Sequence, residues 1–415
     1  MTVNAEKSNG GLNWFVTGLF IVAQLAGGGI VALPTAVIQS GLWTGIFLNI
    51  LLTIMACSTS IMLGKCWLIL QRRWPVIYKD NHCREPYPEI CMRALGPRFK
   101  NLASICIQLN QFGICVVFLL LSSKNIQHFL KAFFDVNFSF CLLILILALL
   151  LFPFTLLKSP EDFWWAAVLS AGTTTIAVIL ICFGTLMDSS VCAKISVGMP
   201  PNNKFRHPGF PTIQHDMKKP KEFTKASIIA FLILSMLYLP VCILGYIVYG
   251  NSLRESIMNS IQNVWIQHTA SFLITGHAIF SIIIVINPIN QIAEKKFFVP
   301  QEFGPFRIIV RGIVLFLVVL VAESIPTFGP LLDLSGGSTQ TSTALIYPFF
   351  GILGGGAATF TAIRELTYTH FVPPCYISAF MDKQKNEVNS LLLKRFDGIC
   401  GKNIYESRQI HNGIY

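Results

Sequence analysis

Charged side chains are scarce in this chain of 415 residues, and this shortage narrows the class of protein. Asp, Glu, Lys and Arg together make up 12% of the sequence, whereas hydrophobic residues make up 53%. A soluble domain has about a quarter charged residues. Together with a mean hydropathy of +0.61, this composition excludes an ordinary soluble protein and predicts an integral membrane protein.

Residue patterns typical of enzymes and metal centres are also lacking. The sequence has no paired carboxylates, no nucleophile elbow and no cluster with metal-ligand spacing. His82, Cys83 and Cys91 share one loop, but metal binding there has little support. We therefore expect no enzymatic activity, no metal and no cofactor. Many of the cysteines lie in apolar runs and are interpreted as small apolar side chains, namely Cys57, Cys106, Cys115, Cys141, Cys182 and Cys242.

Long apolar runs are abundant, and they predict an all-α, multi-pass membrane protein. Six uncharged runs reach the roughly 20 residues that a helix needs to cross a bilayer: 43–64, 102–123, 139–157, 163–187, 226–249 and 264–292. A glycine-interrupted run (14–38), a short one (306–322) and a Gly-rich one (334–363) bring the expected count to about nine or ten. We divide the chain into a cytoplasmic lead-in without a cleavable signal (1–13), a transmembrane domain (14–372) and a polar tail (373–415).

Basic residues predict how these spans are oriented, because cytoplasmic loops collect Lys and Arg. The net charge of +11 lies mostly in loops and in the tail, so orientation explains it better than nucleic-acid binding does. The basic loop 71–100 is placed in the cytoplasm, and two later basic loops, around Lys218 and Lys295, should match it. Nothing between Asp188 and Lys218 could cross a bilayer as a helix, so the sequence leaves both later loops outside and lacks one crossing. In this orientation, Asn137 begins an outer glycosylation sequon, Asn137-Phe138-Ser139.

The first apolar run is interrupted by Gly27, Gly28 and Gly29, and Pro34 follows five residues later. Glycine and proline are poor helix formers, and any backbone group they release inside a bilayer needs another partner. Freed N–H groups can bind a carboxylate and freed C=O groups can bind a cation, which suits a site for a polar solute. The alternative is close helix packing through small residues.

Several segments together resemble the amino acid/auxin permease family of amino-acid transporters, most closely its invertebrate members. The resemblance covers nearly the whole chain and is specific in combination. It is carried by Gly27-Gly28-Gly29-Ile30-Val31-Ala32-Leu33-Pro34 with Gly41 and Gly45, by Phe210–Met217 with Lys218-Lys219-Pro220, by Tyr238-Leu239-Pro240 with Gly245-Tyr246 and Tyr249-Gly250, by Asn287-Pro288-Ile289-Asn290-Gln291 with Glu294, and by Ile325–Leu331 with Gly336–Thr339.

The resemblance implies eleven helices in a leucine-transporter-like fold with two inverted repeats. Broken helices one and six would face each other across the substrate, and alternating access would occur around them. The chain departs from the family at helix six, because only His207, Phe210 and Pro211 match the expected pattern and the apolar half before Arg206 is absent. A second irregularity near 345–356 suggests that helices ten and eleven are incomplete. Exons that are skipped or wrongly joined would explain both.

Candidate site residues follow from the break and from this resemblance. Gly27, Gly28, Gly29, Ile30 and Val31 are expected to bind the substrate's α-carboxylate through backbone amides. The remaining candidates are His207 and Phe210 for the substrate, and Pro34, Pro211, Asp216 and Glu294 for gating or structure, with Glu294 paired to a nearby base.

His277 lies in the middle of its apolar run, where a charged residue costs about 2.5–3.5 kcal/mol and should face a cavity. Imidazole titrates near neutral pH, so His277 is the candidate for a coupling proton; the alternative is a neutral histidine bonded between helices. Ala23 stands where some sodium-coupled relatives have an asparagine, which favours protons over sodium. His268, nearer the membrane edge, is expected to be structural. Thr173, Thr174, Thr175, Asn110 and Gln111 could line a polar path or bond between helices.

The leading interpretation is secondary active transport of small neutral amino acids, coupled to protons, at the plasma membrane or an endolysosomal membrane. The expected partners are the amino acid and the lipid bilayer, without nucleic acid; protein partners are unknown. The alternative is a non-transporting truncated isoform, or a binding or sensing membrane protein, since half of the substrate site is missing.

Overall fold

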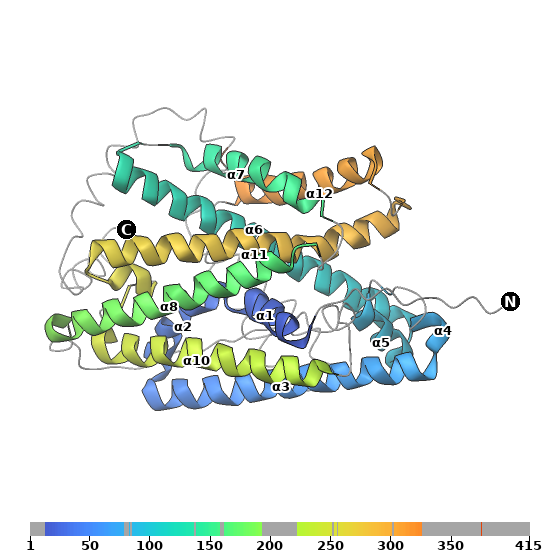
Figure 1. The fold of residues 1–415 in the computed structure, drawn as a ribbon, viewed down its shortest axis with the longest axis horizontal. Helices are drawn as coiled ribbons and strands as arrows, with labels where there is room; N and C mark the ends of the chain where they lie inside the picture. Colours follow the sequence, from blue (N-terminus) through green and yellow to red (C-terminus); the bar gives the residue numbers. More distant parts are fainter. Residues whose placement is uncertain are drawn as a thin grey trace, which may run out of the picture.

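The computed structural model describes residues 13–78, 83, 85–136, 138–157, 162–192, 222–250, 253–254, 256–300, 303–325 and 375. Within these ranges the protein is entirely helical, and Figure 1 shows the helices as one bundle. The elements are α1 (Trp14–Leu25), α2 (Gly27–Ser40), α3 (Leu42–Arg73), α4 (Pro75–Tyr78), α5 (Pro86–Leu95), α6 (Pro97–Phe134), α7 (Phe140–Thr155), α8 (Trp164–Cys192), α10 (Phe223–Tyr249), the 3₁₀ helix η4 (Ile257–Ser260), α11 (Val264–Lys296) and α12 (Pro305–Ser324).

Six of these helices are long and apolar enough to cross a membrane, namely α3, α6, α8, α10, α11 and α12. Two shorter apolar helices, α1 and α7, add to them, and α2 continues the run of α1 after one residue. The described ranges thus agree with a multi-pass, all-α protein. The runs that we placed beyond residue 325 lie outside the described residues.

Glycine and proline residues determine where several helices begin or end, which the apolar runs alone do not show. Gly41 and Gly96 adopt φ values of 81° and 96°, a region that glycine enters without a steric penalty. Pro97 then starts α6 at a position where its missing N–H costs nothing. At the start of α11, the Asn263 side chain accepts hydrogen bonds from the N–H groups of Trp265 and Ile266.

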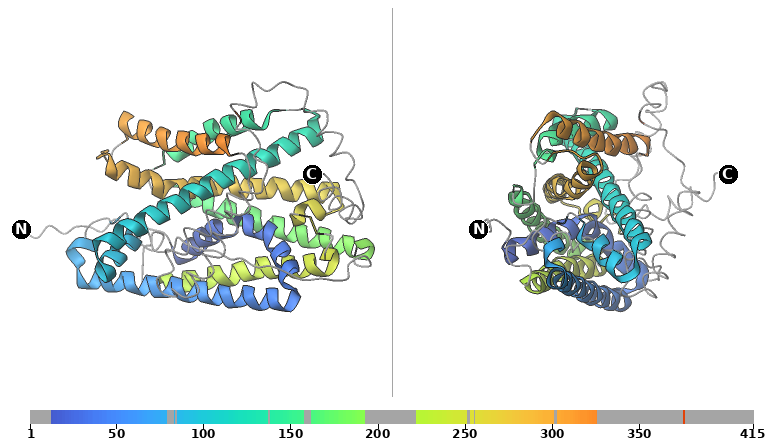
Figure 2. Two further views of the ribbon diagram at one scale, coloured as in Figure 1. Left: turned by 180° about the vertical axis from the view of Figure 1, so that it is seen from behind. Right: turned by 90° about the vertical axis from the view of Figure 1, so that its right-hand side faces the viewer.

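The long helix α11 lies at the centre of the bundle and packs against α8 on one side and α6 on another. It is the most buried of the six candidate spans, whereas α3 is the most exposed. The helices α1, α2, α3 and α10 form the part beside α8, and α7 and α12 lie beyond α6 (Figure 1). The helix α6 runs diagonally across the bundle and joins these parts (Figure 2). Much of α11, including His277 and Ser281, is therefore buried inside the bundle.

Consecutive long helices usually alternate in direction, but α8 and α10 run in the same direction (Figure 1). Asp188, near the end of α8, accepts a 2.6 Å hydrogen bond from the hydroxyl of Tyr249, the last residue of α10. The end of α8 and the start of α10 therefore lie at opposite ends of the bundle. The residues that connect them, 193–221, lie outside the described ranges.

The charge pattern predicted that the basic loop near Lys295 lies on the same side as loop 71–100, whereas the count of apolar runs left it on the opposite side. Lys295 Nζ lies 3.0 Å from Glu85 Oε2, in the first basic loop. The prediction from charge therefore agrees with the structure, and the count of apolar runs was wrong. Because α8 and α10 are parallel, the chain returns to the side that the positive-inside rule demands.

Candidate functional site

The predicted break occurs at a single residue, Ala26, between α1 and α2. Its N–H still bonds the carbonyl of Val22, while its φ and ψ of −75° and 0° end the regular helix. Gly27, Gly28 and Gly29 form the first turn of α2 rather than an open stretch. Helix ends leave backbone groups without intrahelical partners. The carbonyl end of α1 and the N–H end of α2 therefore meet at one point, and Ile30 of α2 is buried beside it.

Two hydroxyl groups from other helices hold the carbonyl end of α1. Ser281 of α11 donates a hydrogen bond to Ala23 O at 3.0 Å, and Tyr238 of α10 donates one to Leu25 O at 2.5 Å. A Cβ atom on Gly29 would lie 3.3 Å from the Tyr238 hydroxyl. The tip of Tyr238 therefore contacts both halves of the broken helix, and the absence of a side chain at residue 29 permits this approach.

His277 lies beside the break in a cluster of hydroxyl groups, with only 1% of its surface exposed. Its Nδ1 is 2.6 Å from Thr174 Oγ1 and 2.9 Å from Ser170 Oγ, both in α8. Its Nε2 is 3.3 Å from Ser281 Oγ, and the ring meets Phe118 edge-on at 5.9 Å between centroids. The cluster links α8, α11 and, through Ser281, the end of α1.

In one tautomer of the neutral imidazole, Nδ1–H donates to Thr174 Oγ1, whose own proton goes to Ser170 O at 2.7 Å. In this tautomer Nε2 carries no proton, and a proton taken up there would be donated to Ser281 Oγ.

Glu294 lies at the other end of α11 and pairs with two bases. Its Oε1 is 2.9 Å from Arg307 Nε and 2.6 Å from Arg311 Nε, and all three side chains are buried. Arg311 also donates to the carbonyl groups of Thr155 and Leu157 at the end of α7. This cluster connects α7, α11 and α12; a role for Glu294 in gating stays a prediction.

The other polar residues of the expected path are distributed differently. Thr173 and Thr175 bond to carbonyl groups of their own helix, so Thr174 is the one of the three that joins the His277 cluster. Asn110 and Gln111 are buried in α6. His268 lies near the start of α11, where its ring meets Phe133 at 5.2 Å. Pro34 lies in α2, where its ring approaches Gly245.

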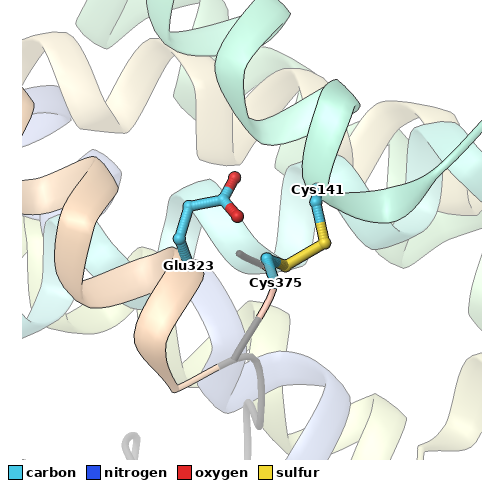
Figure 3. Close-up of side chains that lie close together, drawn as sticks. All are labelled: Cys141, Glu323 and Cys375. Atoms are coloured by element: carbon cyan, nitrogen blue, oxygen red, sulfur yellow. A yellow bond between two sulfur atoms is a disulfide. The ribbon is translucent and has the colours of Figure 1, made fainter. Parts of the chain in front are cut away.

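The interpretation of Cys141 as a plain apolar side chain was wrong. It forms a disulfide with Cys375, and the Glu323 carboxylate lies beside the two sulfur atoms (Figure 3). The sequence could not show this pairing because 234 residues separate the two cysteines. Ligand atoms of these three residues lie within 4.8 Å of one another, but sulfur atoms bonded to each other do not act as thiolate ligands.

Several predicted residues lie outside the described ranges, and the structure does not bear on them: His207, Phe210, Pro211, Asp216, Asn137 and His82. Conversely, sequence reasoning missed Ser170, Ser281 and Tyr238. Ser281 follows His277 by four residues, and Thr174 follows Ser170 by four, so each pair shares a helix face. That spacing was the available signal. Tyr238 belongs to the segment Tyr238-Leu239-Pro240, which supports the family resemblance but by itself indicates no role in the site.

The bundle, its apolar helices and its broken first helix define an integral, multi-pass membrane protein with a transporter fold. Among solved structures it is similar to a substrate-bound, outward-open Na⁺-coupled sialic acid symporter, with a TM-score of 0.51 and 14% identity over 88% of this chain and 92% of that one. This likeness supports the leucine-transporter-like fold.

The model of the family "Transmembrane amino acid transporter protein" matches residues 10–202 and 205–379, and the chain belongs to this family. It is a family of transporters, not of enzymes. Among Arabidopsis thaliana proteins, the chain is 25% identical to amino acid transporter AVT1J over 357 residues, covering 79% of each. It is 23% identical to lysine histidine transporter-like 1 over 379 residues, covering 81% of this chain and 79% of that protein.

Proposed function

We propose that this protein is a secondary active transporter of small neutral amino acids, driven by protons. The observation that carries the proposal is the junction of three features at Ala26: the N–H groups of the first turn of α2, carbonyl groups at the end of α1, and a buried histidine beside them. The N–H groups of Gly27 to Gly29 suit the substrate's carboxylate. Membership in an amino acid transporter family supports the substrate class.

His277 would carry the coupling proton. A proton on Nε2 would create a donor to Ser281 Oγ, which itself donates to Ala23 O. The proton would thereby tighten the link between α11 and the end of α1, next to the substrate position. Because a buried charge is costly in the membrane, the proton would be held only while the site is open to water on one side. Alternating access would then couple its movement to that of the substrate.

The test is uptake of labelled glycine or alanine by the purified full-length protein in lipid vesicles. We expect an inward pH gradient to drive uptake and a sodium gradient to have no effect. His277→Gln should lose the response to the pH gradient, whereas His268→Gln, changed near the membrane edge, should keep it. An unchanged pH response in His277→Gln would eliminate the assigned role.

The alternative is a non-transporting member of the family, and a sequence feature favours it. The segment between α8 and α10 contains no apolar stretch long enough to supply the other half of a substrate site. Correctly inserted protein that takes up no amino acid under any gradient would establish this alternative. Uptake above that of empty vesicles would exclude it.

A further inference from the structure

The carbonyl end of α1 is a position that suits a cation. The last-turn carbonyl groups of a helix lack intrahelical partners and carry the negative end of the helix dipole. In broken helices of transporters, such carbonyl groups coordinate ions. In this protein, the described structure shows neutral hydroxyl groups on two of them, Ser281 on Ala23 O and Tyr238 on Leu25 O.

Tyr238 differs from Ser281 in how it reaches the break. It comes from α10, 213 residues away along the chain, and its 2.5 Å hydrogen bond runs from a buried hydroxyl to the last residue of α1. The same hydroxyl would be 3.3 Å from a Cβ atom on Gly29 in the next half-helix. The phenol tip thus occupies the space directly between the two helix ends.

A hydroxyl and a metal cation compete for the same lone pairs of a carbonyl oxygen. The Tyr238 proton satisfies Leu25 O without any net charge, and the packing of the ring in α10 holds it there. A sodium ion could use this carbonyl only by displacing the Tyr238 hydroxyl from it. A hydrogen-bond donor on the substrate can compete with the Tyr238 hydroxyl for Leu25 O more effectively than sodium can. The substrate also gains binding free energy from the N–H end of α2.

We propose that Tyr238 is a specificity-determining residue that excludes sodium from the transport site by occupying the cation position at Leu25 O. The inference rests on the proposed function, because it concerns the ion preference of that same site. This role of Tyr238 would explain physically why the site uses protons rather than sodium. The Tyr238 hydroxyl occupies the carbonyl end of α1, and the titratable His277 is linked to that end through Ser281.

The experiment compares wild-type protein with Tyr238→Phe, which removes the hydroxyl and keeps the ring. The control is Tyr246→Phe, a half-buried tyrosine on the same helix. The first readout is the melting temperature of each purified full-length protein in sodium chloride, relative to choline chloride at equal ionic strength. A bound ion stabilises the folded protein by mass action, so this measurement does not depend on transport.

We expect sodium to stabilise neither the wild-type protein nor Tyr246→Phe, and to raise the melting temperature of Tyr238→Phe by at least about 2 °C. Loss of one competing hydrogen bond corresponds to a gain in sodium affinity of about tenfold, or about 1.4 kcal/mol. In vesicles, uptake by Tyr238→Phe should become stimulated by a sodium gradient, with the control unchanged.

Sodium binding by the wild-type protein would overturn the proposal, and so would an absence of sodium stabilisation in Tyr238→Phe. If Tyr238→Phe does not fold, Gly29→Ala replaces it, because a Cβ atom 3.3 Å from the Tyr238 hydroxyl would require the hydroxyl to shift by a few tenths of an ångström. This second variant should likewise gain stabilisation by sodium, and a lack of gain would count against the proposal. Absence of uptake in every variant would overturn the proposed function while the melting temperatures still decide the role of Tyr238.

Discussion

At the scale of single residues, one carboxylate is shared by two buried arginines, Arg307 and Arg311. Glu294, Arg307 and Arg311 are each at most 3% exposed. Removing one partner of a buried ion pair leaves an uncompensated charge in a medium of low polarity. An exposed pair, in contrast, contributes little because water screens it. The chain has one ion pair of each kind at neighbouring residues: a buried one at Glu294 and an exposed one at Lys295.

Glu294→Gln should therefore destabilise the protein strongly, by about 3–5 kcal/mol, because two buried guanidinium groups lose the negative charge of the carboxylate that both contact. Lys295→Gln, which breaks the pair with Glu85 at a side chain that is 54% exposed, should change stability by about 0–1 kcal/mol. Unfolding of the purified protein in mixed micelles, followed by circular dichroism, measures both. Similar losses in the two variants would show that Glu294 is not a structural anchor.

At the scale of elements, α10 packs against α2 and η4 through a position without a side chain. A Cβ atom on Gly245 would lie 3.0 Å from Ile257 Cδ1 and 3.1 Å from Pro34 Cβ. Pro34 belongs to the half-helix that begins at Gly27, so this contact sets the distance between α10 and the candidate site. Gly172 in α8 provides the contrast, because a Cβ atom there would meet nothing within 4 Å.

Gly245→Ala should destabilise the protein by about 1–3 kcal/mol, since the rigid proline ring and Ile257 leave no room for the methyl group. Gly172→Ala should instead leave stability unchanged or raise it by up to about 1 kcal/mol, because alanine is the better helix former. Thermal unfolding of both variants in the same detergent compares them. A stable Gly245→Ala protein would mean that α10 can move away from α2 at little cost.

The short helix α5 is tied to the base of α6 by a carboxylate. Glu89 accepts hydrogen bonds from Lys100 at 2.5 Å and from Tyr78 at 2.9 Å. Burial alone would raise the pKa of Glu89, but these hydrogen bonds and the charge of Lys100 outweigh it and lower the pKa below its ordinary value of 4.5. A lowered folded-state pKa adds stability above the unfolded value, and this stability disappears as the pH falls through the folded one.

Glu89→Gln should therefore lower the melting temperature at neutral pH, and the difference from wild type should shrink as the pH falls well below 4.5. Lys100→Met, which removes the other partner, should behave in the same way. Melting curves collected across a pH series provide the measurement. A difference that stays constant with pH would show that the charge of Glu89 has no part in the stability.

At the scale of the whole molecule, the arrangement of helix ends fixes which loops share a side of the membrane. Lys295 pairs with Glu85, so the loop after α11 lies with the loop after α3. The start of α11 lies at the opposite end, since a helix of 33 residues is about 50 Å long. The orientation of the protein can therefore be tested independently of transport.

Cysteines introduced at Arg72 and Lys296, both exposed, should react with a membrane-impermeant maleimide from the same side of oriented vesicles. A cysteine in place of Trp265, which is 71% exposed, should react from the other side. Labelling of the unmodified protein provides the background from native cysteines. Reaction of the first two variants from opposite sides would contradict the parallel arrangement of α8 and α10.

The apolar runs and the break could be predicted because both are local properties of the sequence. A helix in a membrane must satisfy its own backbone, so a run of about 20 apolar residues determines the element that it forms. The break lies at Ala26, directly before the predicted glycines, because glycine is tolerated in a first helical turn where N–H groups have no intrahelical partner anyway. The Glu85–Lys295 contact agrees with the orientation that the basic loops predicted, but it depends on helix directions that the apolar runs do not contain.

The sequence by itself determined the class of protein, the helical elements, the broken first helix and the buried histidine. Each follows from composition or from residues close together along the chain. Only the tertiary structure decided which side chains meet at the break. Tyr238 reaches Leu25, His277 reaches Ser170 and Cys141 reaches Cys375 across 213, 107 and 234 residues. Contacts at such separations depend on how helices pack, and packing is a property of the whole chain.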